Sequence, residues 1–194
     1  MLHTYELRWF FSECPLKLSN HLENESELQS RTDWYALPCS PNCGIKLREG
    51  KLETKIRCHA GSVQQSGNLT GRLESYKKWS LQFPSEDRPT FEDLGLAGWV
   101  EVGKERNLLR FRVDDQQDIH HSPTRPENGC EFELTRLTVP RGIFWTVGLE
   151  AMGNVDQLES NLLTVMRFVE QAGGRQQPFN LQNSMGYAEW LSQH

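Results

Sequence analysis

The 194-residue sequence lacks long hydrophobic runs. No stretch approaches the roughly 20 apolar residues that a membrane-spanning helix needs. Residues 1–6 show no basic segment leading into an apolar one, so we expect no signal peptide. Cysteine is scarce and odd in number, at five, which without a secretory signal indicates reduced thiols. These features predict a cytoplasmic protein with no membrane partner.

An excess of positive charge is also lacking. Lys and Arg number 21 against 26 Asp and Glu, a net charge of -5, whereas proteins that bind a nucleic acid duplex are usually basic. Hydrophobic residues make up only 37%, yet six Trp and nine Phe argue against disorder. A single domain over 1–194 with charged groups in its interior would reconcile these values.

Several segments alternate strictly between charged and apolar residues. In 51–58 the odd positions are charged at Lys51, Glu53, Lys55 and Arg57, and the even positions are apolar or small. A period of two is typical of a strand with one ionic and one apolar face. The same pattern recurs around Arg8, Arg48, Arg110 and Glu131. We therefore expect an α+β fold in which about eight mostly antiparallel strands form a closed or nearly closed barrel with flanking helices.

The barrel is predicted over about residues 3–150. Its strands are expected at 4–11, 33–37, 44–48, 51–58, 73–81, 99–104, 108–113, 131–137 and 144–150. A hairpin turn is expected at 49–50, and polar loops at 61–71 and 114–128. Helices are predicted over 12–28 and 154–172, with short helical turns at 90–94 and 187–191, the latter docking an aromatic side chain. Asn154 is the expected N-cap of the second helix.

The direction of the ionic faces separates two classes of barrel. If they point outward, the lumen is apolar, as in lipocalin-like barrels that hold small ligands. If they point inward, the charges need partners of opposite sign or a bound polyanion with metal, because unpaired buried charge is costly. Basic side chains beside a separate set of carboxylates are what a metal–polyphosphate ligand requires.

The order of these charged motifs resembles the CYTH superfamily, whose members are also called triphosphate tunnel metalloenzymes. The resemblance covers roughly residues 3–170. It rests on Glu6-Leu7-Arg8, Ile45-Lys46-Leu47-Arg48, Leu52-Glu53-Thr54-Lys55, Arg110-Phe111-Arg112, Glu131-Phe132-Glu133 and Leu149-Glu150. The resemblance implies an eight-stranded tunnel that binds a triphosphate-containing substrate with Mg²⁺ or Mn²⁺ and hydrolyses or cyclises it.

The matching positions give the expected site. Basic residues expected to bind phosphate are Arg8, Arg48, Lys55, Arg57, Lys78, Arg110 and Arg112, and carboxylates expected to hold metal are Glu6, Glu131, Glu133 and Glu150. The superfamily's N-terminal signature is Glu-x-Glu-x-Lys, and here Thr4 stands in place of the first Glu and Arg8 in place of the Lys. One metal-binding carboxylate is therefore missing, which disfavours a two-metal arrangement.

We expect metal-dependent binding and hydrolysis of a small molecule that carries a triphosphate or polyphosphate chain. A triphosphatase of this kind acts by charge stabilisation and by positioning a water molecule, and the sequence identifies no general base. The alternative is a non-catalytic phosphate- or nucleotide-binding or interaction domain that kept the tunnel and lost turnover. Thr4 is the feature that favours this alternative.

Two other groups of residues could bind metal. Cys39, Cys43, Cys58 and His59 offer four zinc ligands, but their spacing differs from the usual two-residue knuckle. The pair His120-His121 lies in a polar loop, and we expect it to be solvated. Neither group outweighs the ionic strands as a candidate site.

Overall fold

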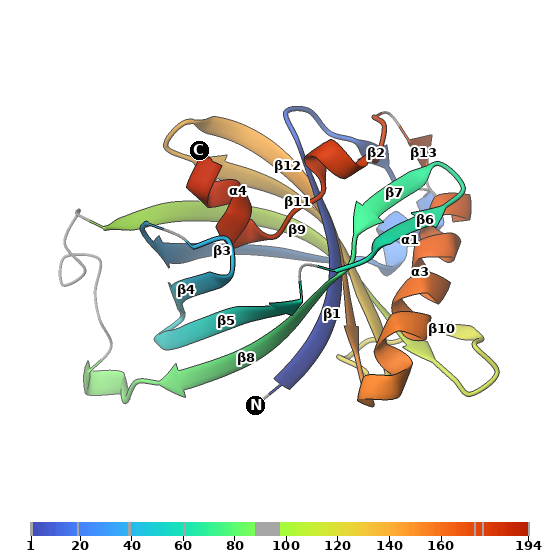
Figure 1. Ribbon diagram of the computed structural model, residues 1–194, viewed down its shortest axis with the longest axis horizontal. Coiled ribbons are helices and arrows are strands. Elements are labelled where there is room, and N and C mark those ends of the chain that lie inside the picture. Colours follow the sequence, from blue (N-terminus) through green and yellow to red (C-terminus); the bar gives the residue numbers. More distant parts are fainter. Residues whose placement is uncertain are drawn as a thin grey trace.

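The computed structural model describes residues 2–18, 20–38, 40–59, 61–87, 98–172, 174–175 and 177–193. Eight antiparallel strands close into a barrel, which confirms the predicted fold (Figure 1). In order around the barrel they are β9 (Trp99–Val113), β11 (Gly129–Val139), β12 (Gly142–Met152), β1 (Leu2–Phe11), β8 (Glu74–Gln82), β5 (Lys51–His59), β4 (Cys43–Arg48) and β3 (Glu27–Ala36). Pairing of β3 with β9 over ten residue positions closes the ring.

Smaller elements flank the barrel. They are β2 (Leu16–Lys17) paired with β13 (Gly174–Arg175), the hairpin of β6 (Val63–Ser66) and β7 (Leu69–Arg72), β10 (Ile119–His121) beside β9, and the helices α1 (Asn20–Glu25), α3 (Leu158–Ala172) and α4 (Tyr187–Gln193). Short 3₁₀ turns occur at Ser85–Asp87, Val155–Gln157 and Leu181–Asn183. No helix in these ranges is long and apolar enough to cross a membrane.

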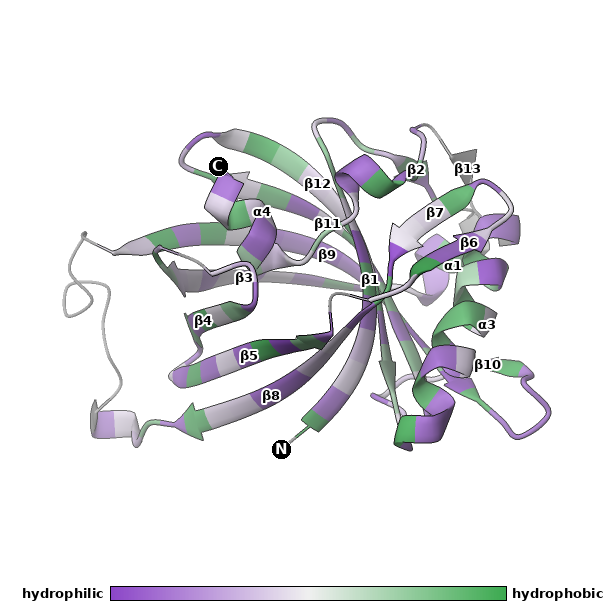
Figure 2. Ribbon diagram, viewed as in Figure 1, coloured by the Kyte–Doolittle hydropathy of each residue, from purple (hydrophilic) through white to green (hydrophobic). Residues whose placement is uncertain are grey.

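Two apolar clusters stabilise the barrel from different sides. The larger one packs α3 against the outer face of β1, β11 and β12. In Figure 2, α3 carries hydrophobic residues among polar ones, and the strands are banded along their length. The smaller cluster joins inward-facing residues at one end of the barrel to α4: Phe10, Tyr35, Val102, Leu137, Trp190 and Leu191. The inward-facing surface that these residues leave free is mostly charged.

Several predicted elements are confirmed with small changes. The hairpin turn between β4 and β5 has positive φ at Glu49 (51°) and Gly50 (73°), the backbone that a tight two-residue turn requires. The aromatic residue of the last turn, Trp190, is buried and stacks on Phe10 at 4.6 Å between ring centroids. The helix expected from Asn154 begins at Leu158, because a 3₁₀ turn precedes it and the Asn154 side chain makes no capping hydrogen bond.

The predicted helix over 12–28 is wrong. Of the described residues in this range, only Asn20–Glu25 are helical, and 27–36 forms β3, which extends the strand expected at 33–37. The leucines of this region do not follow a 3.6-residue period. Leu16, in the short strand β2, and Leu18 are buried, and Leu28 is 75% exposed. Tertiary packing, together with the hydrogen-bonded pairing of β3 with β9, therefore determines the secondary structure of this segment.

Two further strand assignments needed correction. The strands expected at 99–104 and 108–113 form one 15-residue strand, β9, because residues 103–108 pair with β3 on one side and with β11 on the other. The loop expected at 61–71 contains the β6–β7 hairpin, whose Leu69 is buried and whose Gly71 lies against the Trp9 ring. The helical turn expected at 90–94 lies outside the described residues.

A charged cavity inside the barrel

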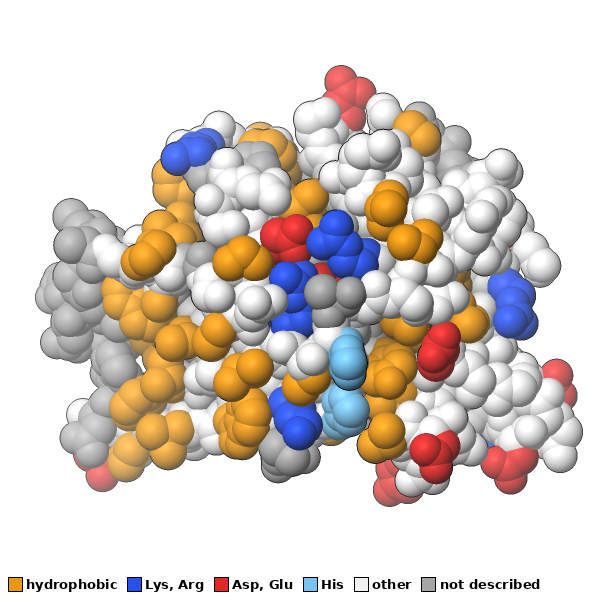
Figure 3. All heavy atoms as spheres, viewed as in Figure 1, with side chains coloured by type: hydrophobic (Ala, Val, Ile, Leu, Met, Phe, Trp, Pro, Cys, Tyr) orange, Lys and Arg blue, Asp and Glu red, His pale blue; other side chains and the backbone are white. Residues whose placement is uncertain are grey.

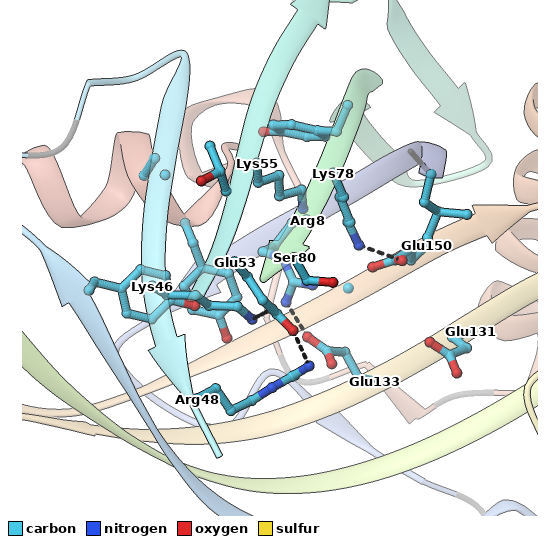
Figure 4. A pocket seen from close by; sticks show the side chains of 18 of the residues that line it. Arg8, Lys46, Arg48, Glu53, Lys55, Lys78, Ser80, Glu131, Glu133 and Glu150 are labelled. Atoms are coloured by element: carbon cyan, nitrogen blue, oxygen red, sulfur yellow. Dashed lines mark hydrogen bonds and ion pairs between the residues drawn. The ribbon is translucent and has the colours of Figure 1, made fainter. Parts of the chain in front are cut away.

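A cavity of about 770 Å³ lies inside the barrel, in the size range of small-molecule sites (Figure 4). Half of its lining residues are charged, and most of these come from the inward face of the strands. The basic lining residues are Arg8, Arg31, Lys46, Arg48, Lys55, Lys78, Lys104, Arg106, Arg110 and Arg125, and the acidic ones are Glu53, Glu131, Glu133 and Glu150. Basic side chains therefore outnumber acidic ones by more than two to one in this lining.

The ionic face of β5 points inward, as the tunnel interpretation requires. Lys55 lines the cavity, whereas its neighbour Ile56 lies on the outer face and is 39% exposed. Partly exposed apolar side chains outside the lining also occur at Ile45 on β4 and Leu81 on β8. Figure 3 shows hydrophobic side chains gathered over this part of the surface. An apolar lumen of the lipocalin type is therefore inconsistent with the structure.

Five of the seven residues predicted to bind phosphate line the cavity: Arg8, Arg48, Lys55, Lys78 and Arg110. The other two do not. Arg57 donates hydrogen bonds to Glu74, Glu189 (2.6 Å) and Asn42, and so fastens α4 to β5 and β8. Arg112 is exposed on the part of β9 that pairs with β10. Both alternate in step with the inward-facing residues of their strands, but each lies at an end of the barrel, beyond the cavity.

Three of the four predicted metal-binding carboxylates are neighbours across adjacent strands. Glu6 on β1 is directly opposite Glu150 on β12, which in turn is opposite Glu131 on β11. Glu133 lies two residues along β11 on the same face. Glu131, Glu133 and Glu150 line the cavity, and Glu6 is 3% exposed. The barrel thus assembles the acidic residues that the sequence singled out.

Each of these carboxylates is paired with two basic side chains. Glu6 binds Lys55 and Lys78, the latter at 3.5 Å. Glu150 binds Lys78 at 2.6 Å and Arg125 at 2.9 Å. Glu131 binds Arg110 at 3.3 Å and Arg125 at 3.5 Å, and Glu133 binds Arg8 at 2.5 Å and Arg106 at 3.0 Å. The acidic row is therefore neutralised from within the protein.

The pairs shift the carboxylate pKa values in different directions. Burial alone would raise the pKa of Glu133 and of Glu150, but their basic partners hold both pKa values well below the usual range. Burial raises the pKa of Glu131, and the neighbouring Glu150 and Glu133 add to this rise against the effect of Arg125 and Arg110. Of Glu131, Glu133 and Glu150, it is therefore Glu131 that most readily takes up a proton.

The predicted metal ligands suit Mg²⁺ or Mn²⁺ by their chemistry, since both ions prefer carboxylate oxygens. Their arrangement does not fit. Among the described residues, no group of three or more His, Cys, Asp or Glu side chains is placed to hold a metal ion. Thr4 is buried and donates its hydroxyl to Glu6 at 3.2 Å, so it adds no negative charge where the superfamily signature has a carboxylate.

The alternative zinc ligands are not assembled in the described part of the chain. Cys39 lies outside the described residues, and Cys43 and Cys58 are free thiols. Cys58 is exposed, and its thiol donates to the carbonyl oxygen of Ile56 at 3.8 Å. His120 is exposed on β10 and pairs with Asp114 at 2.8 Å, so it belongs to a short strand and not to the expected loop.

A second ionic centre lies beside the cavity and was not predicted. Asp33 is fully buried and is surrounded by Lys104 at 2.7 Å, Arg31 at 3.4 Å and Lys46 at 3.6 Å. Lys104 also donates to the Tyr35 hydroxyl at 2.9 Å. Burial would raise the pKa of Asp33, but the three cations hold it well below its usual range. One carboxylate therefore faces three cations, which leaves a local surplus of positive charge.

The signal for part of this centre is present in the sequence. Lys104 and Arg106 share the parity of Arg110, so a continuous strand from 99 to 113 would have placed all three in the lumen. Because two separate strands were expected, at 99–104 and 108–113, Lys104 and Arg106 were not expected in the lumen. Asp33 and Tyr35 are two residues apart and lie on the same face of β3, but the sequence pattern does not indicate which cations surround Asp33. Arg125 comes from a loop, where no periodicity applies.

The buried lysine gives a pH prediction. Burial lowers the pKa of Lys104 to about 7, and Lys46 and Arg31 act in the same direction against Asp33. An unfolded lysine titrates near 10.4, so above about pH 7 the unfolded chain keeps a proton that the folded protein releases, and stability rises with pH. We expect the free energy of unfolding to be about 1 kcal/mol higher at pH 8 than at pH 6.5 in urea titrations.

Lys104→Met is the matched variant for this pH dependence, because it removes the titrating group and keeps a long side chain. The difference in free energy of unfolding between the two pH values should shrink in the variant. Lys55, whose pKa burial lowers to about 8, would still contribute in the same direction. An equal difference in the wild type and the variant would contradict the assignment to Lys104.

Comparisons with known proteins identify no family. The sequence matches no protein-family model and no curated protein. Among solved structures, similarity extends to a conserved hypothetical protein from Pyrococcus furiosus at 12% identity, with 95% of this chain and 98% of that chain covered and a TM-score of 0.41. A second similar structure is the PH1819 protein from Pyrococcus horikoshii, at 14% identity, 98% coverage of both chains and a TM-score of 0.43.

Proposed function

We propose that the cavity binds a small molecule that carries a triphosphate or polyphosphate chain. The observation that carries this proposal is the lining, in which ten basic side chains face four acidic ones within about 770 Å³. Cations gathered in a partly desolvated cavity repel one another, and an anion relieves that repulsion. The resemblance to the CYTH superfamily, with its triphosphate substrates, agrees with this ligand class.

The ratio of basic to acidic side chains is highest on one side of the cavity. Glu53 is shared by Lys46 at 2.9 Å and Arg48 at 2.6 Å (Figure 4). Asp33 is shared by three cations in the same part of the barrel. Basic side chains that exceed their acidic partners keep hydrogen-bond donors for a ligand. We therefore place the phosphate oxygens near Lys46, Arg48 and Lys104, opposite the acidic row on β11 and β12.

Hydrolysis of a phosphoanhydride bond is the second candidate function, favoured by Glu131. This carboxylate lines the cavity, and its pKa is raised by burial and by Glu150. A carboxylate with a raised pKa can accept the proton of a water molecule that attacks phosphorus, with the shortened phosphate chain as the leaving group. The cations would stabilise the charge that develops on the phosphate oxygens. A non-catalytic binding domain remains the alternative.

The test measures binding and turnover separately. Tripolyphosphate binding is measured by calorimetry, and phosphate release is assayed with tripolyphosphate, thiamine triphosphate and ATP in Mg²⁺, in Mn²⁺ and in EDTA. Binding of tripolyphosphate supports the proposal, and phosphate release adds the second function. Binding without release from any compound leaves a binding domain. The absence of both would overturn the proposal.

Lys46→Ala is expected to weaken tripolyphosphate binding about tenfold, since a hydrogen bond to a charged group contributes roughly 1.5–3 kcal/mol. The fold should survive, because Glu53 keeps Arg48 and Asp33 keeps Lys104 and Arg31. The matched control is Lys77→Ala on the outer face of β8, which should bind as the wild type does. Equal affinities of the two variants in calorimetry would contradict the placement of the ligand.

A further inference from the structure

Arg125 differs from the other basic residues that line the cavity. Among the described lining residues, the other nine basic side chains come from strands, whereas Arg125 comes from the connection between β10 and β11. Its side chain is 45% exposed, so it reaches the acidic row from the rim of the cavity. Arg125 therefore does not belong to the alternating inward-facing residues of the strands.

The loop that carries Arg125 is fixed at both ends. The amide of Ser122 donates to the carbonyl oxygen of Arg110 at 2.8 Å, and the Arg110 guanidinium donates to the carbonyl oxygen of Pro123 at 3.3 Å. After Arg125, the Asn128 side chain donates to the carbonyl oxygen of Val113 at 3.0 Å. These contacts hold Arg125 over the row of carboxylates, so its place there is built into the fold.

Arg125 bridges the two carboxylates that face each other across β11 and β12. One terminal nitrogen lies 2.9 Å from Glu150 Oε1 and the other lies 3.5 Å from Glu131 Oε2. A guanidinium in this position supplies positive charge to both groups at once and matches planar carboxylates with two donors. A divalent cation held by Glu131 and Glu150 would have to occupy the same space.

We propose that Arg125 is a built-in counter-ion that takes the place of a divalent cation between Glu131 and Glu150, so that the cavity receives its phosphate ligand without metal. The inference rests on the proposed function for the identity of the ligand. Its structural basis is independent of that identity: each of the four predicted metal ligands already has two basic partners, and Thr4 lacks the charge of the signature carboxylate.

Two measurements on the full chain test this proposal. Electron paramagnetic resonance of free Mn²⁺ reports metal binding to the protein alone, and calorimetry in EDTA reports tripolyphosphate binding without metal. The variants are Arg125→Ala, Arg125→Lys and the control Arg136→Ala, whose guanidinium pairs with Glu105 at 3.0 Å away from the cavity. Circular dichroism melting checks that each variant is folded.

We expect the wild type to bind tripolyphosphate in EDTA and to bind no Mn²⁺ at concentrations that saturate Arg125→Ala. Arg125→Ala should gain Mn²⁺ binding and lose about tenfold in tripolyphosphate affinity in EDTA, because one charged donor is lost and Glu131 and Glu150 repel the anion. Arg125→Lys, which keeps the charge and loses the bridge, should lie between them. Arg136→Ala should match the wild type in both measurements.

The outcomes separate this inference from the proposed function. Mn²⁺ binding by the wild type as tight as that of Arg125→Ala overturns the inference, as does a wild type that needs Mn²⁺ or Mg²⁺ to bind tripolyphosphate. A wild type that binds no tripolyphosphate under any condition overturns the proposed function. In that case a gain of Mn²⁺ binding in Arg125→Ala alone still supports the counter-ion role.

Discussion

Asp33→Asn is expected to lower the free energy of unfolding by about 3–5 kcal/mol, the usual cost of removing one partner from a buried ionic group. Asp33 is fully buried, and Lys104, Lys46 and Arg31 all lie within 3.6 Å of its carboxylate. The amide has nearly the same shape, so the change isolates the charge. The three cations would then lose the carboxylate that they share, although Lys46 would keep its pair with Glu53. Urea titration followed by tryptophan fluorescence measures the loss.

Glu105→Gln is the matched control, because it makes the same acid-to-amide change in an ion pair on the outside of the barrel. Glu105 is 56% exposed and pairs with Arg136, so the expected loss is below about 1 kcal/mol. If Asp33→Asn fails to fold, the double variant Asp33→Asn/Lys104→Met removes one of the stranded cations and should recover part of the stability. Equal losses for Asp33→Asn and Glu105→Gln would show that the buried centre contributes no more to the free energy of unfolding than an ion pair on the surface.

The barrel was predictable because the period of a strand is geometric. Successive side chains on a strand point to opposite faces, so charged residues at every second position define one surface wherever the strand lies. That rule correctly put Lys55, Arg110 and Glu131 on the ionic faces of their strands, and in the structure these faces point into the lumen. The rule does not say where the cavity ends. Arg57 and Arg112 obey the alternation, yet they lie at the ends of the barrel.

Other parts of the site depend on contacts that no local pattern encodes. Asp33 looks like an ordinary polar residue at the start of a short strand, and only the closure of β3 on β9 brings Lys104 beside it. Arg125 lies in a polar loop whose position is set by hydrogen bonds to β9. The helix predicted over 12–28 is wrong for the same reason, because burial of Leu16 and Leu18 outweighs helix propensity in this region.

Trp190→Ala is expected to lower the free energy of unfolding by about 3–5 kcal/mol, as for large aromatic residues removed from a core. Trp190 is 2% exposed, stacks on Phe10 at 4.6 Å and meets the edge of Phe144 at 5.3 Å. The seven residues of α4 are too few for a helix that is stable without tertiary packing. Loss of this anchor would therefore release the whole helix from the end of the barrel.

Trp79→Ala is the matched control, since it deletes the same side chain where it is 43% exposed on β8. Its expected loss is below about 1 kcal/mol, because a half-exposed residue leaves no closed cavity behind. Release of α4 should also disturb Tyr187, whose ring lies 4.0 Å from the Lys104 ammonium and 4.7 Å from the Arg8 guanidinium. Tripolyphosphate affinity should therefore fall in Trp190→Ala even under conditions where the variant remains folded. Equal stability losses in the two variants, measured in urea, would contradict the role of Trp190 as the anchor of α4, and an unchanged tripolyphosphate affinity would show that α4 does not help to build the cavity.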